Sequence, residues 1–549
     1  MRIVQSAVCL IIGVLGAAAF GAPGSAVRLN SLGFLPDGPK VASVTGDASG
    51  FVVRETSSGR DVFAGALSAP RFQADVNETV RVADFSAFTL PGEYVLETSE
   101  GARSEPFSIA AAVYQPAFIT VTRGFYLWRC GTAVAGTHRG RLFAHAACHL
   151  EDGFLDYQGK PGERRDGTGG WHDAGDYGKY TVNAGITLGV MFMAWDHFPE
   201  SLRALDLGLP RTAPGYPDFL QELKWETDWL LKMQYPDGSG RVAHKLTAKV
   251  FEPFCLPEDD RQKRYFTDWS TEAVASFVAM MAQASRHFAP YDPVYAARLL
   301  EAARVSYRFL RDTPPRRFEQ GEFKTGAYQS DDADDRLWAA AELWESTGED
   351  GFRKDFEAHV DVAGATVEAD WDWRDVSNLG VFQYVLSKRA GRNPDVVARL
   401  QRSIVAVADE IAAQAERDVY ARPLVRYYWG ANGTVARQVV NLQVADRIAP
   451  NPKYRAAALA AVDHLLGRNV YGRSYLTGVG HDPARFPHDR RSGADREPEP
   501  WPGYLVGGGH TATGWIDREE DYRTNEIAIN WQGALVYALA GFLPVAAPQ

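Results

Sequence analysis

The stretch GGWHDAGDYGKY, residues 169–180, stands directly before an apolar segment with helical spacing, Asn183–Phe198. Its two carboxylates, Asp173 and Asp176, are three positions apart with Ala and Gly between them, so a tight turn can bring both side chains to one point. Such a pair suits the binding of one shared water molecule. The alternative is an ordinary helix N-terminus, where Asp is favoured as a cap and by the helix dipole.

Helices separated by long polar loops are predicted from this stretch to the end of the chain. Roughly a dozen helices fit a toroid of paired helices, with inner helices around a core and loops collected at the ends. We therefore predict an all-α barrel over residues 113–545. The segments with apolar residues at helical spacing are Asn183–Phe198, Phe219–Gln234, Thr271–Phe288, Val294–Leu310, Asp335–Thr347, Val396–Ala413, Tyr454–Leu466 and Asn525–Phe542.

A different pattern precedes the helical region. Short β-like runs divided by turn residues predict a small β-sandwich over residues 25–110. The stretch Ala110–Val113 marks the junction, so the chain is expected to be multidomain, with a β-sandwich followed by the barrel. The predicted strands are Lys40–Val44, Phe51–Val53, Thr79–Phe85, Tyr94–Leu96 and Phe107–Ile109.

The first 22 residues have the composition of a secretory signal. Arg2 is followed by an apolar run and then by small residues that suit a cleavage site. We therefore expect a secreted or periplasmic protein, without a membrane span because no later run stays apolar for about 20 residues. The net charge of −11 on 549 residues argues against nucleic acid as a partner. A neutral substrate is favoured.

Two further clusters carry polar side chains suited to chemistry. Glu526 stands where a polar loop becomes the apolar closing segment, so it could reach a cleft from a rigid helix. His488 and Arg490 could donate hydrogen bonds to sugar hydroxyls. The plain alternatives are a first-turn helix residue for the glutamate and an ion-paired surface loop for the other two.

Taken together in this order and spacing, the three clusters resemble glycoside hydrolase family 9, the cellulase family with an (α/α)6 barrel. The segment from Val27 to Pro36 resembles the start of the N-terminal immunoglobulin-like domain of its bacterial members. The resemblance therefore covers nearly the whole chain after the signal. It implies an immunoglobulin-like sandwich in front of an (α/α)6 barrel.

This resemblance also implies roles for the carboxylates. Asp176 is expected to be the general base that activates water, Asp173 its partner in holding that water, and Glu526 the general acid. The family inverts, which requires acid and base on opposite sides of the bond, about 6.5 to 9.5 Å apart. We expect a raised pKa for Glu526 and an ionised Asp176.

Substrate contacts are implied by the same resemblance. His488 and Arg490 match the family's sugar-contacting pair, and Tyr522 matches an aromatic residue of the acid motif. Trp429 lies in a loop similar to the family's Trp-Gly-x-Asn loop, and Trp373 precedes a similar region. Both tryptophans are candidates for stacking on sugar rings, although burial in the core is the common alternative.

Three positions depart from the family pattern. Asp489 stands where many members have a second His, Asp482 where Asn, Lys or Arg is usual, and Gln532 where many cellulases have Asn. All three lie beside the predicted catalytic carboxylates. Hydrolysis is therefore still expected, but the exact sugar and the chain length of the substrate stay open.

Metal ligands are the last candidates. Cys130, Cys148, His149 and His172 form a Cys2His2 set of the kind that tetrahedral structural zinc requires, and some members of the family group hold zinc at matching positions. Such a site would fix the loop that begins at Asp173, and buried thiols with unrelated histidines are the alternative. The acidic runs 331–335 and 258–260 are candidate calcium ligands, and solvated loops are the alternative.

The predicted activity is that of an inverting endo-β-1,4-glucanase acting on β-glucan or cello-oligosaccharides. The close alternative is an exo-acting enzyme that releases glucose, cellobiose or glucosamine from short chains. A noncatalytic carbohydrate-binding protein is the alternative from a different class, and the three carboxylates argue against it. We expect a monomer, since the sequence offers no coiled coil.

Overall fold

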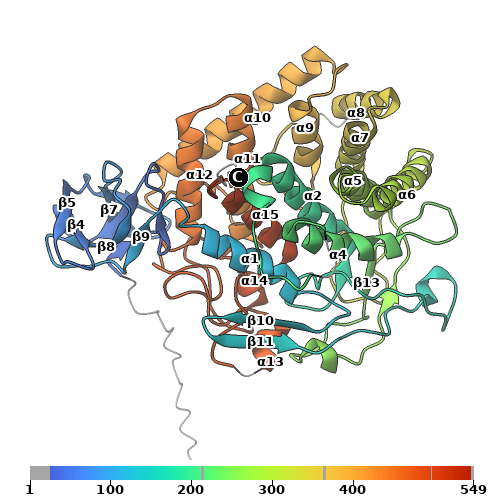
Figure 1. The fold of residues 1–549 in the computed structure, drawn as a ribbon, viewed down its shortest axis with the longest axis horizontal. Coiled ribbons are helices and arrows are strands. Elements are labelled where there is room, and N and C mark those ends of the chain that lie inside the picture. The colour runs from blue at the N-terminus through green and yellow to red at the C-terminus, as the bar shows by residue number, and fades with distance from the viewer. Residues whose placement is uncertain (1–24, 212–214, 363–365, 496, 546–549) are drawn as a thin grey trace, which may run out of the picture.

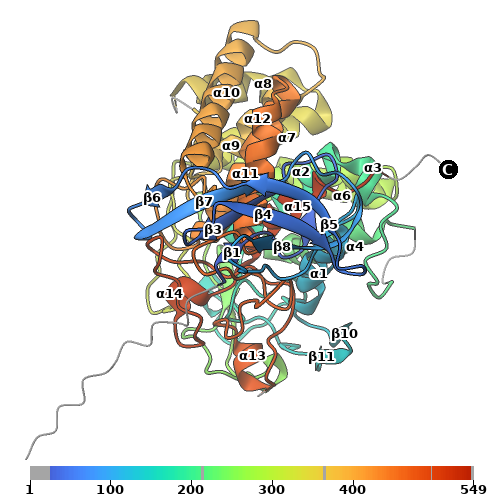
Figure 2. The same cartoon turned by 90° about the vertical axis from the view of Figure 1, so that its left-hand side faces the viewer.

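The computed structural model describes residues 25–211, 215–362, 366–495 and 497–545 and contains a β-sandwich beside a helical barrel (Figure 1). The predicted signal, residues 1–22, lies outside the described residues. Figure 2 shows the sandwich covering one side of the barrel. Among the described helices, none is long and apolar enough to cross a membrane.

The N-terminal domain is built from two packed sheets. One sheet has the strand order β1-β3-β7-β6 and the other β2-β9-β8-β4-β5. Their inner faces enclose a core of aromatic rings, with Phe34, Phe85 and Phe107 in mutual contact. The predicted β-sandwich is confirmed. Its strands are β1 (Val27–Arg28), β2 (Gly33–Phe34), β3 (Val41–Thr45), β4 (Gly50–Glu55), β5 (Asp61–Ala66), β6 (Arg71–Gln73), β7 (Glu78–Asp84), β8 (Gly92–Thr98) and β9 (Phe107–Ile109).

Within the described residues, the long helices of the second domain alternate between outer and inner positions in six consecutive pairs, as in an (α/α)6 barrel. The outer helices are α1 (Gln115–Leu127), α4 (Asp218–Met233), α6 (Pro293–Arg311), α8 (Asp350–Val362), α10 (Pro394–Arg417) and α12 (Pro452–Leu465). The inner helices are α2 (Thr181–His197), α5 (Thr271–Phe288), α7 (Ala333–Thr347), α9 (Ser377–Leu386), α11 (Ala431–Ile448) and α15 (Ile529–Ala540).

Burial explains this alternation. Nearly every residue of α2, α5 and α15 is buried, whereas α10 buries one stripe of residues and exposes the rest. Neighbouring inner helices contact one another, α2 with α5, α5 with α7, α7 with α9, α11 with α15 and α15 with α2. The apolar faces therefore close around one core, and the predicted barrel is confirmed.

Short elements fill the connections between the long helices. They are α3 (Pro199–Leu202), α13 (Arg490–Ala494), α14 (Tyr522–Asn525), η1 (Asp156–Gln158), η2 (Pro257–Asp259), β10 (Val134–His138), β11 (Arg141–His145), β12 (Lys179–Tyr180), β13 (Lys245–Thr247) and β14 (Tyr265–Phe266). The predicted start of the closing helix is wrong. The closing helix begins at Ile529 and not at Asn525, because the residues between them pair with neighbouring segments as short bridges.

Polar side chains join the two domains. Asn30, between β1 and β2, donates to Asp463 Oδ1 of α12 (2.8 Å) and to the hydroxyl of Tyr114 (3.1 Å). Arg28 forms an ion pair with Glu78 (2.7 Å), and both contact the hydroxyl of Tyr420 in the barrel. These partners are largely buried, so separating the domains would leave unpaired polar groups.

Candidate active site

One cavity of about 870 Å³ opens at the end of the barrel where loops lead into the inner helices. Its walls come mainly from segments that directly precede α2, α7, α9, α11 and α15. The structure brings together every catalytic and substrate-contacting residue predicted from the sequence. The cavity is lined by Asp173, Asp176, Glu526, His488, Arg490, Trp429, Tyr522 and Trp373.

A tight turn holds the two aspartates. Asp173 N–H donates to the Gly178 carbonyl (3.0 Å), and Gly178 N–H donates to Asp176 Oδ2 (2.9 Å). The turn packs so closely against the next wall that a Cβ at Gly175 would lie 2.0 Å from the carbonyl oxygen of His488. Glycine is therefore required at that position, and the loop geometry is fixed by its surroundings.

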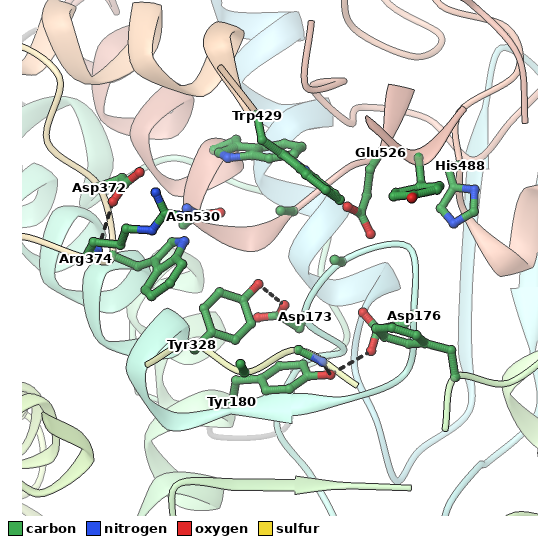
Figure 3. Close-up of a pocket in the computed structure, with 18 of the residues that line it drawn as sticks. Asp173, Asp176, Tyr180, Tyr328, Asp372, Arg374, Trp429, His488, Glu526 and Asn530 are labelled. Atoms are coloured by element: carbon green, nitrogen blue, oxygen red, sulfur yellow. Dashed lines mark hydrogen bonds between the residues drawn. The ribbon is translucent and has the colours of Figure 1, made fainter. Parts of the chain in front are cut away.

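Two tyrosines hold the carboxylates from the floor of the cavity (Figure 3). Tyr328 donates its hydroxyl to Asp173 Oδ2 (2.6 Å), and Tyr180 donates to Asp176 Oδ2 (3.1 Å). The Tyr180 oxygen also accepts from Gly326 N–H (3.1 Å). Because Tyr180 itself occupies the N-cap position of α2, neither aspartate caps that helix. The helix-cap alternative for this motif is therefore wrong.

Glu526 reaches the cavity from an extended segment between α14 and α15. It pairs with His488 in a short bridge, and its carbonyl accepts from Gly507 N–H (2.8 Å). Two residues later, Ala528 pairs with Ala174 in the aspartate loop. Figure 3 shows the Glu526 carboxyl entering from the opposite wall to the two aspartates. The acid and base candidates are thus joined by backbone pairing.

Burial and the charge of Asp176 raise the proton affinity of two carboxyl groups in the cavity, Asp173 and Glu526. Burial and the charge of Asp176 raise the pKa of Asp173 to about 8, against the opposing hydrogen bonds from Tyr328 and Asn183. Burial and the same neighbouring charge raise the pKa of Glu526 well above its usual range. Glu526 therefore keeps its proton near neutral pH, as a general acid must.

His488 and Arg490 form a fixed pair. His488 Nδ1–H donates to the carbonyl of Glu519 (2.6 Å), so Nε2 carries the lone pair and accepts from Arg490 Nη1 (2.9 Å). Burial, together with the arginine's charge, lowers the pKa of His488. Both ring nitrogens are thus engaged by protein groups. This arrangement differs from the expectation that His488 itself donates to a sugar, and it leaves Arg490 as the donor of the pair.

Aromatic rings form the walls beside the carboxyl groups. Trp429 and Tyr522 lie with ring centres 5.5 Å apart and expose 43% and 44% of their surfaces. Trp373 is half-buried and meets Tyr328 at 5.0 Å. Trp371, by contrast, is buried, donates its Nε1–H to Asn441 Oδ1 (3.0 Å) and does not line the cavity. Exposed ring faces in a cavity suit stacking on the apolar faces of sugars.

The three departures from the family pattern have structural explanations. Gln532 is fully buried and bonds to backbone groups of neighbouring segments. Asp489 caps α13 and forms a buried ion pair with Arg491 (3.0 Å). Asp482 pairs with Arg473 (3.0 Å). None of the three lines the cavity.

A second cluster lies behind the aspartate loop. The candidate ligand atoms of Cys130, Cys148, His149 and His172 all lie within 4.8 Å of one another. His172 Nδ1 is buried without a hydrogen-bond partner, and His149 Nε2 meets Asp260 Oδ2 at 3.2 Å. Two thiols and two imidazoles fit a tetrahedral metal such as zinc, and a carboxylate behind a ligating histidine is the usual supporting contact.

Carboxylates of the acidic runs considered for calcium contact other groups of the same chain instead. Asp332 pairs with Arg336 (2.9 Å), and Asp334 accepts from Val376 N–H (2.6 Å). In the ranges that the structure describes, neither run contributes to a metal-like group of three or more side chains. Calcium binding stays a prediction without support from this geometry.

Sequence reasoning missed several residues of the cavity. Tyr180 could have been noticed, since it follows Asp176 by four positions in the quoted stretch. Arg374 directly follows Trp373, and Asn530 follows Glu526 by four positions, so both could have been noticed beside predicted residues. Tyr328 also lines the cavity but lies in a segment without a local motif, so its place becomes evident only when the loops are brought together.

Comparison with known proteins places the chain in a family. Residues 114–539 match the family model described as glycosyl hydrolase family 9, and residues 22–103 match the cellulase N-terminal ig-like domain. The chain is 50% identical to Endoglucanase D of Acetivibrio thermocellus over 530 residues, which cover 96% of this chain and 84% of that protein.

Solved structures agree with this match. A metagenome-derived glycoside hydrolase family 9 endoglucanase superposes with a TM-score of 0.88 at 34% identity, covering 94% of this chain and 98% of that one. A Zn-binding triple mutant of the family 9 endoglucanase J30 gives a TM-score of 0.88 at 32% identity, covering 93% and 100%. The chain is a hydrolase that belongs to glycosyl hydrolase family 9 and carries the family's N-terminal immunoglobulin-like domain.

Proposed function

We propose that this protein is an inverting endo-β-1,4-glucanase, with Asp176 as general base, Asp173 as its partner in holding water, and Glu526 as general acid. The observation that carries the proposal is one cavity in which the aspartate pair and Glu526 lie on opposite walls. Burial beside Asp176 raises the pKa of Glu526, which suits a proton donor. Inversion needs this opposed arrangement, because water attacks the anomeric carbon from the face opposite the leaving oxygen.

The proposed reaction is a single displacement. The water oxygen bonds to the anomeric carbon while Asp176 accepts a proton from that water. At the same time the bond from the anomeric carbon to the leaving oxygen breaks. Glu526 gives its proton to the leaving oxygen. Tyr180 and Tyr328 hold the two aspartates in place throughout. The products are two shorter sugars, and the new reducing end has the α configuration.

Substrate contacts are proposed from the walls of the cavity. Trp429, Tyr522 and Trp373 offer ring faces for stacking, and Arg490 offers a guanidinium to sugar hydroxyls. His488 acts by orienting Arg490. A cavity of about 870 Å³ with exposed rings on its rim suits several sugar units of a β-glucan chain.

A time course of products from reduced-end-labelled cellohexaose, with viscosity loss of a soluble β-glucan, tests the proposal. Mixed internal products with rapid viscosity loss support endo action. Release of only mono- or disaccharides from one end, with viscosity nearly unchanged, favours the exo-acting alternative. Binding without any cleavage of glucans or of glucosamine oligomers favours a noncatalytic carbohydrate-binding protein and overturns the proposal.

We further propose that the Cys130, Cys148, His149 and His172 cluster holds a structural zinc ion. Four protein ligands leave no open position for water, so the metal would supply rigidity and not catalysis. The peptide bond between His172 and Asp173 connects the cluster directly to the catalytic loop. Zinc would therefore fix the starting point of that loop.

The composition of residues 1–22 supports removal of a signal and a secreted or periplasmic location. We place the domain limits at residues 25–110 and 113–545. The buried contacts of Asn30 and Arg28 with the barrel support a stabilising role for the first domain. A monomer is proposed as the active form.

A further inference from the structure

Glu252 lies directly behind the catalytic cavity and takes no part in its lining. Its side chain is 4% exposed, yet it contacts two parts of the site. Oε1 accepts from the backbone N–H of Tyr177 (3.0 Å), the residue next to Asp176. The same oxygen lies 3.3 Å from Nε of Arg490. One carboxyl group thus connects the base loop with the sugar-binding arginine.

Other contacts make this connection rigid. Arg490 N–H donates to the carbonyl of Gly175 in the base loop (3.0 Å), and its guanidinium also donates to His488. The hydroxyl of Tyr177 donates to the carbonyl of Cys255, three residues beyond Glu252. The loop around residue 252 therefore contacts both the backbone N–H and the side-chain hydroxyl of Tyr177.

Glu252 also compensates the positive charge of Arg490. Among the described residues around Arg490, Glu252 is the carboxylate in ion-pair contact with the guanidinium, while His488 offers a neutral nitrogen. Arg490 also lies close enough to Glu526 for its charge to act on that carboxyl group. A buried arginine that loses its partner carboxylate is attracted more strongly to the remaining negative charges, here the catalytic carboxylates.

We propose that Glu252 is a positioning residue for the reaction. Its carboxylate holds the Tyr177 N–H and the Arg490 guanidinium together, and so keeps Asp176 in place opposite Glu526. This inference rests on the proposed function, since it assumes that Asp176 activates the water. The competing explanation is a purely structural ion pair that stabilises the fold and leaves turnover by folded enzyme unchanged.

Two substitutions test the inference. Burial and the charge of Asp176 raise the pKa of Glu252 to about 7, so all variants are compared at pH 8, where its carboxyl group is ionised. Glu252→Gln keeps an oxygen that can accept from Tyr177 N–H but removes the charge facing Arg490, and Glu252→Ala removes both side-chain contacts. We expect kcat to fall about tenfold in the first variant and about 100-fold in the second, because small misplacements of a reacting group cost this much. Glu163→Gln is the matched control, since its side chain is 64% exposed and is not part of the cavity lining.

The readout uses two substrates, cellohexaose and dinitrophenyl β-cellobioside, with thermal melting of every variant. A displaced base slows both substrates by similar factors, because the water must be activated whatever the leaving group is. Equal losses on both substrates in folded Glu252→Gln support the inference. Wild-type kcat on both substrates, with or without a lowered melting temperature, overturns it, and this variant decides alone if Glu252→Ala does not fold. Absence of turnover by the wild type would refute the proposed function itself.

Discussion

Replacing Glu526 by Gln separates acid catalysis from the rest of the mechanism. Glu526 is the glutamate that lines the cavity, and burial beside Asp176 keeps it protonated. General acid catalysis contributes about 10²–10⁴-fold to a rate, which is about 3–5 kcal/mol of the barrier. We expect Glu526→Gln to lose about this factor on cellohexaose, whose sugar leaving group needs a proton.

The same variant should behave differently on dinitrophenyl β-cellobioside. Dinitrophenolate leaves without protonation, so the loss on this substrate should be less than about tenfold. Asp176→Asn should lose activity on both substrates, because the water is then not activated. Initial rates of both variants on both substrates are compared at the pH optimum of the wild type. Equal losses for Glu526→Gln on the two substrates would refute the assignment of the acid.

Three further predictions concern the junction, the metal cluster and the cavity rim. Burial raises the pKa of Asp463 to about 7, so this carboxyl group keeps a proton in the folded protein that it releases in the unfolded chain. The free energy of unfolding therefore falls as the pH rises from about 4 to 7, by at most about 4 kcal/mol. Asp463→Asn should therefore melt higher than the wild type at pH 8 and not at pH 4, and equal shifts at both pH values would contradict this. Asp260→Ala removes the carboxylate behind His149 and should weaken zinc binding about 10–100-fold in a chelator competition; unchanged affinity would count against a metal bound through His149. Tyr522→Ala removes an exposed rim ring and should raise KM about 2- to 12-fold, from about 0.5–1.5 kcal/mol of lost stacking, with little change in kcat; an unchanged KM for cellohexaose would exclude Tyr522 from the binding surface.

The fold was predictable because its signals are local. Alternating short runs before residue 110 indicated a β-sandwich, and apolar residues at helical spacing indicated the barrel. The start of the closing helix was not predictable in this way. Residues between Asn525 and Ile529 are apolar enough to continue a helix, yet they pair with His488 and Ala174, which no local pattern reveals.

The catalytic loop was predictable for a similar reason. Asp173 and Asp176 stand in one compact motif, and glycine between them allows the close approach that the structure contains. Tyr328 is 155 positions from Asp173 and lies in a loop without a motif. Glu252 could be noticed only from its contacts, because a lone glutamate between Phe251 and Pro253 belongs to no recognisable motif.

The contacts of His488 and Asp260 depend on hydrogen-bond partners that residue type alone does not reveal. His488 was expected to donate to sugar, but the Glu519 carbonyl fixes its tautomer and directs the free nitrogen to Arg490. Asp260 belonged to an acidic run that suggested calcium, whereas its carboxylate meets His149 of the metal cluster. Glu519 is 31 positions from His488 and His149 is 111 positions from Asp260, so no local pattern reveals these two partners.

The stereochemistry of the first product tests the central claim most directly. Proton NMR spectra recorded during the first minutes of cellohexaose hydrolysis distinguish the two anomers of the new reducing end before they interconvert. The opposed arrangement of Asp176 and Glu526 predicts that the α-anomer forms first. Early accumulation of the β-anomer would mean that configuration is retained, and would contradict direct attack by water activated at Asp176.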